Sequence, residues 1–397
     1  MIVSSARVGD LAEQVRGVTY GKEDASKTPA TGFLPVLRAG NITDGGLVFD
    51  DLVYVPAGRV SARQKIKKGD IVIAASSGSL DVVGKAAPAL AAFDGGFGAF
   101  CKVIRPNDKV DAAYLAQFFK TPGYRRTISS LAAGANINNL KSEHLDDLQV
   151  RLPPLPEQRR IAAILDQADA LSAKRREALA LLDSLTQSFF IEMFGDPAIN
   201  PHQWPVGRIA DLLESASYGT SEKSASAGEF PVLRMKNLTR SGELDLRNLK
   251  YMELPEGLRS KYLVRAGDVL FNRTNSADLV GKTAMVPQGL PPLAYAGYLI
   301  RLRVNAANSP TYLSRFLNTG YAKLMLRGMC KSIIGTANIN ATEIQAMKIA
   351  VPPLPLQQTF ATRIQAVEAL KATHRAALAE LDALFASLQH RAFAGAL

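Results

Sequence analysis

The sequence predicts an α+β protein in which two similar strand-rich domains are joined by two long antiparallel coiled-coil helices, with a pseudo-twofold internal repeat. Three observations lead to this prediction. Much of the first half of the chain returns in the second half, each half changes to a helical composition after a proline motif, and apolar residues then recur in heptads. We expect a first head at residues 1–152, a central helix at 153–195, a second head at 196–351 and a C-terminal helix at 352–397.

The internal repeat consists of seven collinear matches, separated by 196 to 202 residues. The matched segments are 8–11 and 20–21 with 206–209 and 218–219, 35–43 with 231–239, 69–72 with 267–270, 83–85 with 280–282, 114–118 with 312–316, 135–138 with 337–340, and 153–156 with 352–355. Because loops vary in length more than the framework that they connect, this small drift indicates one fold in both halves.

The length of the chain predicts more than one domain, and its charge favours a polyanionic partner. A chain of 397 residues exceeds what one hydrophobic core usually supports, so two cores are expected. The net charge of +11 lies mainly in the heads, where Lys and Arg outnumber Asp and Glu by four over residues 1–151 and by seven over residues 196–351. A basic surface favours a polyanionic partner such as nucleic acid, although it also serves solubility.

Targeting and cysteine patterns point to the cytoplasm. Residues 1–10 lack the features of a signal peptide, and no apolar run approaches the length of a membrane span. Cys101 and Cys330 are far apart and the four histidines are scattered, so neither a disulfide framework nor a zinc site is predicted. We expect no metal and no cofactor.

Within each head, short β-branched or aliphatic runs alternate with Gly, Asn, Asp and Pro, which is typical of short strands and turns. Residues 71–73 and 299–304 are examples of such runs. One helical segment interrupts the strands of each head, at residues 111–119 and 310–317. The sequence therefore predicts mixed, strand-rich heads with long loops.

A long helix begins after each proline motif, since Pro is tolerated at a helix start and neither Gly nor Pro follows until Gly195 and Gly395. Heptad spacing in both helices predicts seams that bury against a partner helix. The seam of the first helix is Ile164, Ala168, Leu171, Arg175, Ala178, Leu182, Leu185 and Phe189. The seam of the second is Phe360, Ile364, Val367, Lys371, His374, Leu378, Leu381, Phe385 and Leu388.

Chain connectivity makes the two helices each other's partner. Helix one leads from the first head to the second, and helix two starts at the second head, so antiparallel pairing closes the repeat. A helix of roughly 38 residues is about 57 Å long, which would make a spacer between two heads. The alternative is a coiled coil that serves dimerisation alone; Lys371 and His374 then set its register, and we assign them no catalytic role.

The helix starts and the end of helix one are similar to a known family. Residues 152–161 read LPPLPEQRRI, residues 351–358 read VPPLPLQQ, and residues 189–197 read FFIEMFGDP. Together with the repeat of head and helix over the whole chain, these segments resemble the specificity (S) subunit of type I restriction-modification enzymes. The resemblance implies a non-catalytic protein whose heads are target-recognition domains, each reading one half of a bipartite double-stranded DNA target.

The same resemblance implies the partners. The helix pair would set the gap between the two half-sites and dock two methyltransferase subunits, to which restriction-translocation subunits can be added. Two heads on a strut of fixed length suit such a target, because pseudo-twofold symmetry presents both heads to one face of the duplex. No membrane partner is expected.

Candidate DNA-binding residues are polar side chains in loops that recur in both halves or differ between them, because phosphates need cations and hydroxyls and base edges need Arg, Asn or Gln. In the first head they are Arg38, Asn41, Thr43, Ser76, Ser77, Ser79, Lys85, Asn136, Asn138 and Lys141. In the second head they are Arg234, Lys236, Asn237, Thr239, Asn272, Arg273, Thr274, Asn275, Lys282, Asn338 and Asn340.

The shared asparagines have an alternative role, since Asn often fixes loop backbone through bonds between side chain and main chain. This alternative is favoured for Asn41, Asn237 and the shared pairs at residues 136–138 and 338–340. Half-sites that differ in sequence must be read by segments that differ. Residues 76–79 and 272–275 are therefore the better candidates for base contact.

Two rival functions fit the sequence less well. A self-sufficient DNA enzyme would need a cofactor loop, and Gly281-Lys282-Thr283 fails as a phosphate loop because Ser276 stands where that motif requires glycine. An Asn/Asp-Pro-Pro-aromatic stretch is also absent, since Leu152 and Val351 precede the Pro-Pro pairs. A scaffold without DNA function would explain the helices but not the basic charge of the heads.

Overall fold

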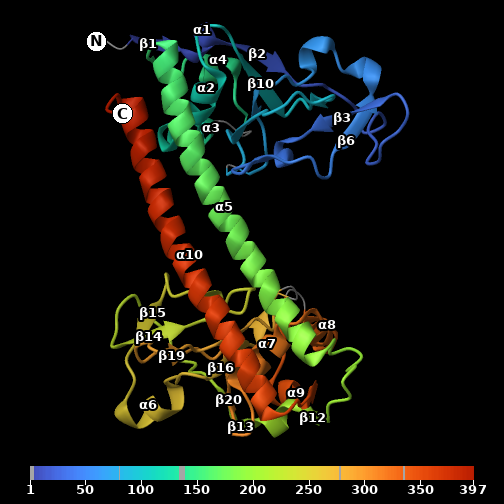
Figure 1. Cartoon of the computed structure of the whole chain (residues 1–397), viewed down its shortest axis with the longest axis vertical. Coiled ribbons are helices and arrows are strands. Elements are labelled where there is room, and N and C mark those ends of the chain that lie inside the picture. Colours follow the sequence, from blue (N-terminus) through green and yellow to red (C-terminus); the bar gives the residue numbers. More distant parts are fainter. Residues whose placement is uncertain (1–3, 80, 134–138, 277–278, 334–335) are drawn as a thin grey trace. The chain divides into compact units, whose positions relative to one another are not determined.

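The computed structural model describes residues 4–79, 81–133, 139–276, 279–333 and 336–397. The chain forms two compact units, Met1–Arg176 with Ala376–Leu397 and Glu177–Arg375. Each unit contains one head and one half of each long helix (Figure 1). The units therefore divide inside the helices, whereas the sequence predicted boundaries at their ends.

The first head is built from short sheets around one four-stranded antiparallel sheet of order β2-β10-β7-β8. These strands are β2 (Ala12–Arg16), β7 (Ile71–Ala74), β8 (Ala86–Pro88) and β10 (Cys101–Pro106). A second sheet, of order β6-β3-β9, contains a parallel pair between β3 and β9. The remaining strands are β1 (Ser4–Arg7), β3 (Phe33–Leu37), β4 (Ile42–Thr43), β5 (Gly46–Leu47), β6 (Val53–Pro56), β9 (Gly96–Phe97) and β11 (Gln149–Leu152).

The second head has the same arrangement. Its four-stranded sheet has the order β13-β20-β16-β18, and the three-stranded sheet β15-β14-β19 again contains one parallel pair, between β14 and β19. A further three-stranded sheet has the order β17-β22-β21. The strands are β12 (Val206–Arg208), β13 (Leu213–Tyr218), β14 (Phe230–Leu233), β15 (Lys250–Met252), β16 (Val269–Asn272), β17 (Thr274–Asn275), β18 (Thr283–Met285), β19 (Ala294–Tyr295), β20 (Leu299–Val304), β21 (Lys331–Ile333), β22 (Thr336–Asn338) and β23 (Lys348–Ala350).

Each head also carries short helices, more than the sequence predicted. The two expected ones are α2 (Ala112–Phe118) and α7 (Pro310–Leu317). The others are α1 (Val8–Leu11), α3 (Pro122–Ala133), α4 (Ser142–Asp146), α6 (Glu256–Tyr262), α8 (Gly320–Met329) and α9 (Ala341–Ala346). The buried faces of α2 and α7 form part of the head cores: Tyr114 and Tyr312 are almost fully buried, and each hydroxyl donates to a strand carbonyl.

A buried ion pair shows how closely the two heads agree. Asp70 and Asp268 follow Gly69 and Gly267, whose positive φ angles of 88° and 87° are conformations that glycine adopts without strain. Asp70 accepts two hydrogen bonds of 2.8 Å from Arg105, and Asp268 accepts bonds of 2.8 and 2.9 Å from Arg303. The repeated Gly-Asp motif is therefore a structural turn in both heads.

The repeat is confirmed, but its first match was out of register. The Val8 amide donates to the Leu148 carbonyl at 2.9 Å, and the Ile209 amide donates to the Met347 carbonyl at the same distance. Residues 8–11 are thus equivalent to 209–212, not to 206–209. The short Val-Gly similarity in the sequence was misleading because strand pairing, rather than that dipeptide, fixes the register.

Two further segments were also misaligned. A Cβ at Gly17 would lie 2.0 Å from the Gly98 carbonyl oxygen, and one at Gly219 would lie 2.3 Å from that of Ala296. Gly17 is therefore the counterpart of Gly219, not Gly21. Lys141 and Asn340 directly precede the equivalent helices α4 and α9, so residues 338–340 correspond to 139–141, whereas residues 135–138 of the proposed match lie outside the described residues.

The two long helices are α5 (Leu155–Phe194) and α10 (Leu354–Ala394). In the second unit, ion pairs join Asp183 to Lys371 at 2.6 Å and Glu192 to Arg363 at 3.2 Å. The residue number on α10 decreases as the residue number on α5 increases, so the two helices are antiparallel here. In both units their apolar residues join a head core, with Leu165 and Ala392 in the first and phenylalanines of α5 and α10 in the second.

The predicted seam fits α10 better than α5. All nine predicted α10 positions are buried or half-buried. In α5, by contrast, Leu171 and Leu185 are 45% and 37% exposed, while their neighbours Ser172 and Thr186 are buried. The prediction was therefore displaced by one residue at these points, because packing against the head cores selects the inward face of α5 and a heptad pattern alone does not.

A buried glutamine at the start of each long helix explains the proline-glutamine motif. Gln158 accepts a 2.8 Å hydrogen bond from the Asp111 amide and donates a 2.8 Å bond to the Pro153 carbonyl. Gln357 likewise accepts from the Ser309 amide and donates to the Pro352 carbonyl, both at 2.8 Å. Each glutamine thereby joins the start of a long helix to the first turn of α2 or α7. We call this arrangement the glutamine clamp.

Replacing either clamp glutamine by leucine, in Gln158→Leu or Gln357→Leu, should destabilise the corresponding unit by about 1–3 kcal/mol, because a buried amide and a buried carbonyl lose their partners. Urea unfolding followed by circular dichroism measures the change. Gln358→Leu, at the exposed neighbouring position, is the matched control and should stay within about 0.5 kcal/mol of the unchanged chain. Equal losses in clamp and control variants would contradict the clamp.

Candidate nucleic-acid interface

Three loop segments of the first head meet at one place. The Gly98 amide donates to the Leu37 carbonyl at 2.8 Å, which ties the turn before β10 to the end of β3. The Phe100 carbonyl accepts bonds of 2.8 and 3.0 Å from the amides of Ala75 and Ser76, which follow β7. Residues 38–43, 75–79 and 98–100 are therefore neighbours, and we call them the loop cluster of the first head.

The second head repeats this cluster. The Ala296 amide donates to the Leu233 carbonyl at 2.9 Å, and the Arg273 amide donates to the Tyr298 carbonyl at 3.0 Å. The Ile339 amide in turn donates to the Arg273 carbonyl at 2.9 Å. The loop cluster of the second head thus gathers residues 234–239, 272–275 and 296–298, with residues 338–340 beside them.

Asn41 and Asn237 are structural, contrary to their place among the candidate DNA contacts. They are 4% and 2% exposed. Asn41 accepts from the Arg38 amide and donates to the Asp50 carbonyl, at 2.8 and 2.7 Å, and Asn237 accepts from the Arg234 amide and donates to the Asp245 carbonyl, at 2.9 and 2.8 Å. Both close the turn that follows β3 or β14, as the alternative reading of the asparagines proposed.

The prediction that Asn272 contacts DNA is also wrong, because Asn272 is fully buried in β16 and its side-chain amide donates to the Leu279 carbonyl. Lys85 and Lys282 extend toward the turns of their own heads. Lys85 pairs with Asp44 at 3.0 Å, and Lys282 donates to the carbonyls of Met235 and Leu238. Burial, with Arg240 nearby, lowers the pKa of Lys282 below its usual value.

Other candidates support the loop backbone and keep part of their side chain accessible. Thr43 and Thr239 donate to carbonyls within their own turns. Asn340 caps α9 by accepting from the Glu343 amide at 2.9 Å, and Asn338 accepts from the Thr274 hydroxyl at 3.2 Å. Asn136 and Asn138 lie outside the described residues.

The remaining candidates are half-buried or exposed donors. Arg38 pairs with Asp51 at 2.6 Å, Arg234 donates to the Asn248 carbonyl, and Arg273 lies 4.8 Å from the ring centre of Tyr218. The half-buried ones are Arg38, Ser76, Ser77, Arg234, Arg273, Thr274 and Asn275, and the exposed ones are Ser79, Lys141, Lys236 and Asn338. Guanidinium, ammonium, amide and hydroxyl groups at one place can donate to phosphates and base edges.

One exposed aromatic ring per head was missed by the sequence analysis. Phe100 is 68% exposed and Tyr298 is 53% exposed, although both belong to the loop clusters. Both stand three residues after a fully buried aromatic, Phe97 or Tyr295, and directly before a buried strand. The common spacing of the two aromatic pairs was a signal in the sequence, but only polar residue types had been sought.

The described residues hold no group of His, Cys, Asp and Glu side chains suited to a metal ion. Among those same residues, no helix has the length and apolarity needed to span a membrane. Burial raises the pKa of the Cys101 thiol to about 12, which suppresses its reactive thiolate form.

Comparison with known proteins gives a consistent result. The sequence model of the family described as the type I restriction modification DNA specificity domain matches residues 3–181 and 201–383. The chain is 33% identical over 411 residues to the EcoKI specificity subunit of Escherichia coli K12, with 99% of this chain and 88% of the relative covered. It is 32% identical over 415 residues to the StySPI specificity subunit of Salmonella potsdam, with 99% and 89% covered.

Two solved structures share the fold. The S subunit of a type I restriction-modification system from M. genitalium has a TM-score of 0.60 and 14% identity, with 98% of this chain and 96% of that chain covered. A chain from a type I system studied for its assembly and conformational transition has a TM-score of 0.54 and 18% identity, with 99% and 98% covered.

The turn after β14 offers a direct test of which polar residues are structural. Asn237→Ala should lower the free energy of unfolding by about 1–3 kcal/mol, since it leaves the buried Arg234 amide and Asp245 carbonyl without their partner. The adjacent Lys236→Ala, at an exposed position, should change it by less than about 0.5 kcal/mol. Chemical denaturation of both variants decides the point, and an Asn237→Ala variant as stable as Lys236→Ala would return Asn237 to the DNA-contact candidates.

Proposed function

The chain belongs to the family of type I restriction-modification specificity subunits, and we propose that each of its heads reads one half of a bipartite double-stranded DNA target through its loop cluster. The observation that carries this proposal is the duplicated cluster itself. Two heads of one fold place cationic, amide, hydroxyl and aromatic side chains at equivalent positions. The segments that differ between the heads, residues 76–79 and 272–275, lie inside these clusters and suit the reading of unlike half-sites.

The helix pair supports a role as spacer and docking site. Helices α5 and α10 are continuous over 40 and 41 residues, and such helices are stiff enough to fix a separation. Large apolar side chains are exposed at several positions along them and can supply apolar contact area to partner proteins. These are Leu171, Leu181, Leu185, Ile191, Leu370 and Leu384. We infer that they bind two methyltransferase subunits, which supply the chemistry, and that the complex works in the cytoplasm with or without restriction-translocation subunits.

Methylation of a host genome tests the whole proposal. A host that carries this gene and the gene of its methyltransferase subunit should methylate one motif made of two short half-sites with an unread gap, and deletion of this gene alone should abolish that methylation. Sequencing that detects methylated bases gives the answer. Methylation of every motif after the deletion, or methylation by the purified chain without a partner, would contradict the assignment.

The exposed aromatics give the loop clusters a further way to bind DNA. In a duplex the base edges are accessible in the major groove, where an aromatic ring can make apolar contact with a thymine methyl group. The backbone at Phe100 and Tyr298 is held in place, because the carbonyl of each residue accepts a hydrogen bond from the segment that follows β7 or β16. We infer that each ring packs against the bases of its own half-site.

Replacing an aromatic by alanine, in Phe100→Ala or Tyr298→Ala, should weaken binding of the target duplex by the complex with methyltransferase subunits about tenfold, or ~1.4 kcal/mol. The salt dependence of affinity should not change, since no charge is lost. Lys236→Ala should instead reduce the slope of log affinity against log salt by about one. Leu90→Ala, at an exposed apolar site outside the clusters, is the control and should bind normally. Normal binding by both aromatic variants would refute the ring contact.

A further inference from the structure

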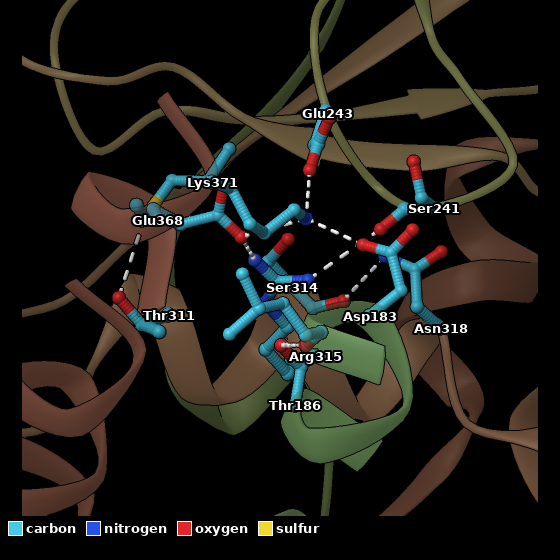
Figure 2. A network of polar contacts seen from close by, with 12 residues as sticks. Asp183, Thr186, Ser241, Glu243, Thr311, Ser314, Arg315, Asn318, Glu368 and Lys371 are labelled. Carbon is cyan, nitrogen blue, oxygen red and sulfur yellow. Dashed lines mark hydrogen bonds and ion pairs between the residues drawn. The ribbon is translucent and has the colours of Figure 1, made fainter. Parts of the chain in front are cut away.

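Six charged side chains in the second unit form one connected cluster, and Figure 2 labels all of them except Arg375. They come from both long helices, α7 and the loop after β14, and they are Asp183, Glu243, Arg315, Glu368, Lys371 and Arg375. The Lys371 ammonium is 2.6 Å from Asp183 and 3.2 Å from Glu368, and it also pairs with Glu243. We call this group the Lys371 cluster.

Lys371 is the centre of the cluster and is only 1% exposed. An ammonium removed from water is tolerated when carboxylates surround it. Three cations face three carboxylates here, with Arg375 at 2.5 Å from Glu243 and Arg315 at 2.9 Å from Glu368. Burial acts to lower the pKa of Lys371, but its bonds to Asp183 and Glu243 hold that pKa above the usual value. The formal charges of the cluster therefore balance.

Glu243 connects the Lys371 cluster to the loop cluster of the second head. The Thr239 amide donates to the Glu243 carbonyl at 2.9 Å, and the Glu243 amide donates to the Thr239 hydroxyl at 3.0 Å, so Glu243 closes the turn that continues residues 234–239. Arg315 also donates to the Ser241 carbonyl of this turn. Figure 2 shows Lys371 between Glu243 of the turn and Asp183 of α5.

The first unit has a different pair at the equivalent positions. The clamp glutamines Gln158 and Gln357 are equivalent and differ in number by 199. The same difference along α5 and α10 makes Ser172 the counterpart of Lys371. The amides of Val48 and Asp245 donate to the carbonyls of Asn41 and Asn237, which aligns Gly46 with Glu243. In the first unit, Ser172 and Gly46 therefore stand where the second unit has Lys371 and Glu243. The Asp44 carboxylate of the first turn pairs instead with Lys85, within its own head.

We propose that Lys371 is a positioning residue that fixes the reading turn of the second head, residues 239–246, against the helix pair, so that accurate reading of one half-site depends on the Lys371 cluster. The first head reads its half-site without this anchor. The proposal rests on the proposed function in one respect, namely that residues 234–246 face DNA. A turn held in place discriminates between bases, because its donors cannot move to form hydrogen bonds with a wrong base edge.

The test uses the full chain in complex with its methyltransferase subunits. Binding is measured for the target duplex and for duplexes with single base-pair substitutions in each half-site. Lys371→Met should reduce discrimination about tenfold at one half-site and leave the other unchanged, and Lys371→Arg should restore most of it. Ser172→Ala, at the equivalent buried position, is the matched control and should alter neither. Equal losses at both half-sites, or no loss, would overturn the proposal.

A second variant guards against a simple folding defect. Lys371→Ser combined with Glu243→Gly copies the pair of the first unit and leaves two cations facing two carboxylates, so the chain should fold while discrimination is still lost at the same half-site. Hydrogen exchange of the wild-type and variant complexes without DNA gives a readout independent of the proposed function. Amides 239–246 should exchange at least about tenfold faster in both variants, with amides 41–48 unchanged. Unaltered exchange would overturn the anchor even if the wild-type complex proved not to bind DNA.

Discussion

The glutamine clamp is the contact on which the rest of the structure depends. One buried side-chain amide joins the end of a strand, the start of a long helix and the first turn of a head helix. Since an amide group has both a donor and an acceptor, it can satisfy two backbone groups that point in different directions. The prolines around it restrict the backbone further. The direction in which each long helix leaves its head is set at this point, and the inward faces of α5 and α10 follow from it.

The sequence predicted the fold well where the signals were local. Helix α7 and strand β20 were expected at their observed bounds, and both long helices within two residues of their starts. Helices α3 and α8 were not expected, because Gly123, Gly320 and Gly328 lower the helical signal while tertiary packing overrides it. The α5 seam could not be assigned correctly, since two adjacent apolar faces compete and only the head cores decide between them.

Prediction of the candidate site was less complete, for a related reason. Residue type placed Asn41, Asn237 and Asn272 among the candidate DNA contacts, although a structural role was favoured for the first two. Polarity alone does not reveal that a side chain is buried and already bonded to backbone. Because only polar residue types were taken as candidates, Phe100 and Tyr298 were not predicted to contact DNA. Lys371 was treated as a residue that sets helix register, and its contact with Glu243 joins segments 128 residues apart, which no heptad pattern contains. Long-range pairing of this kind emerges only from the folded chain.

The division of the chain into units has a consequence for its biosynthesis. The second unit is one continuous stretch, Glu177–Arg375, whereas the first unit combines the beginning of the chain with its last 22 residues, Ala376–Leu397. Ala392 is 1% exposed in the first core, where Phe385, Leu388 and Phe393 also pack. A ribosome therefore delivers everything that the second unit needs before the first unit can be finished. The head that is translated first is therefore the one that completes its core last.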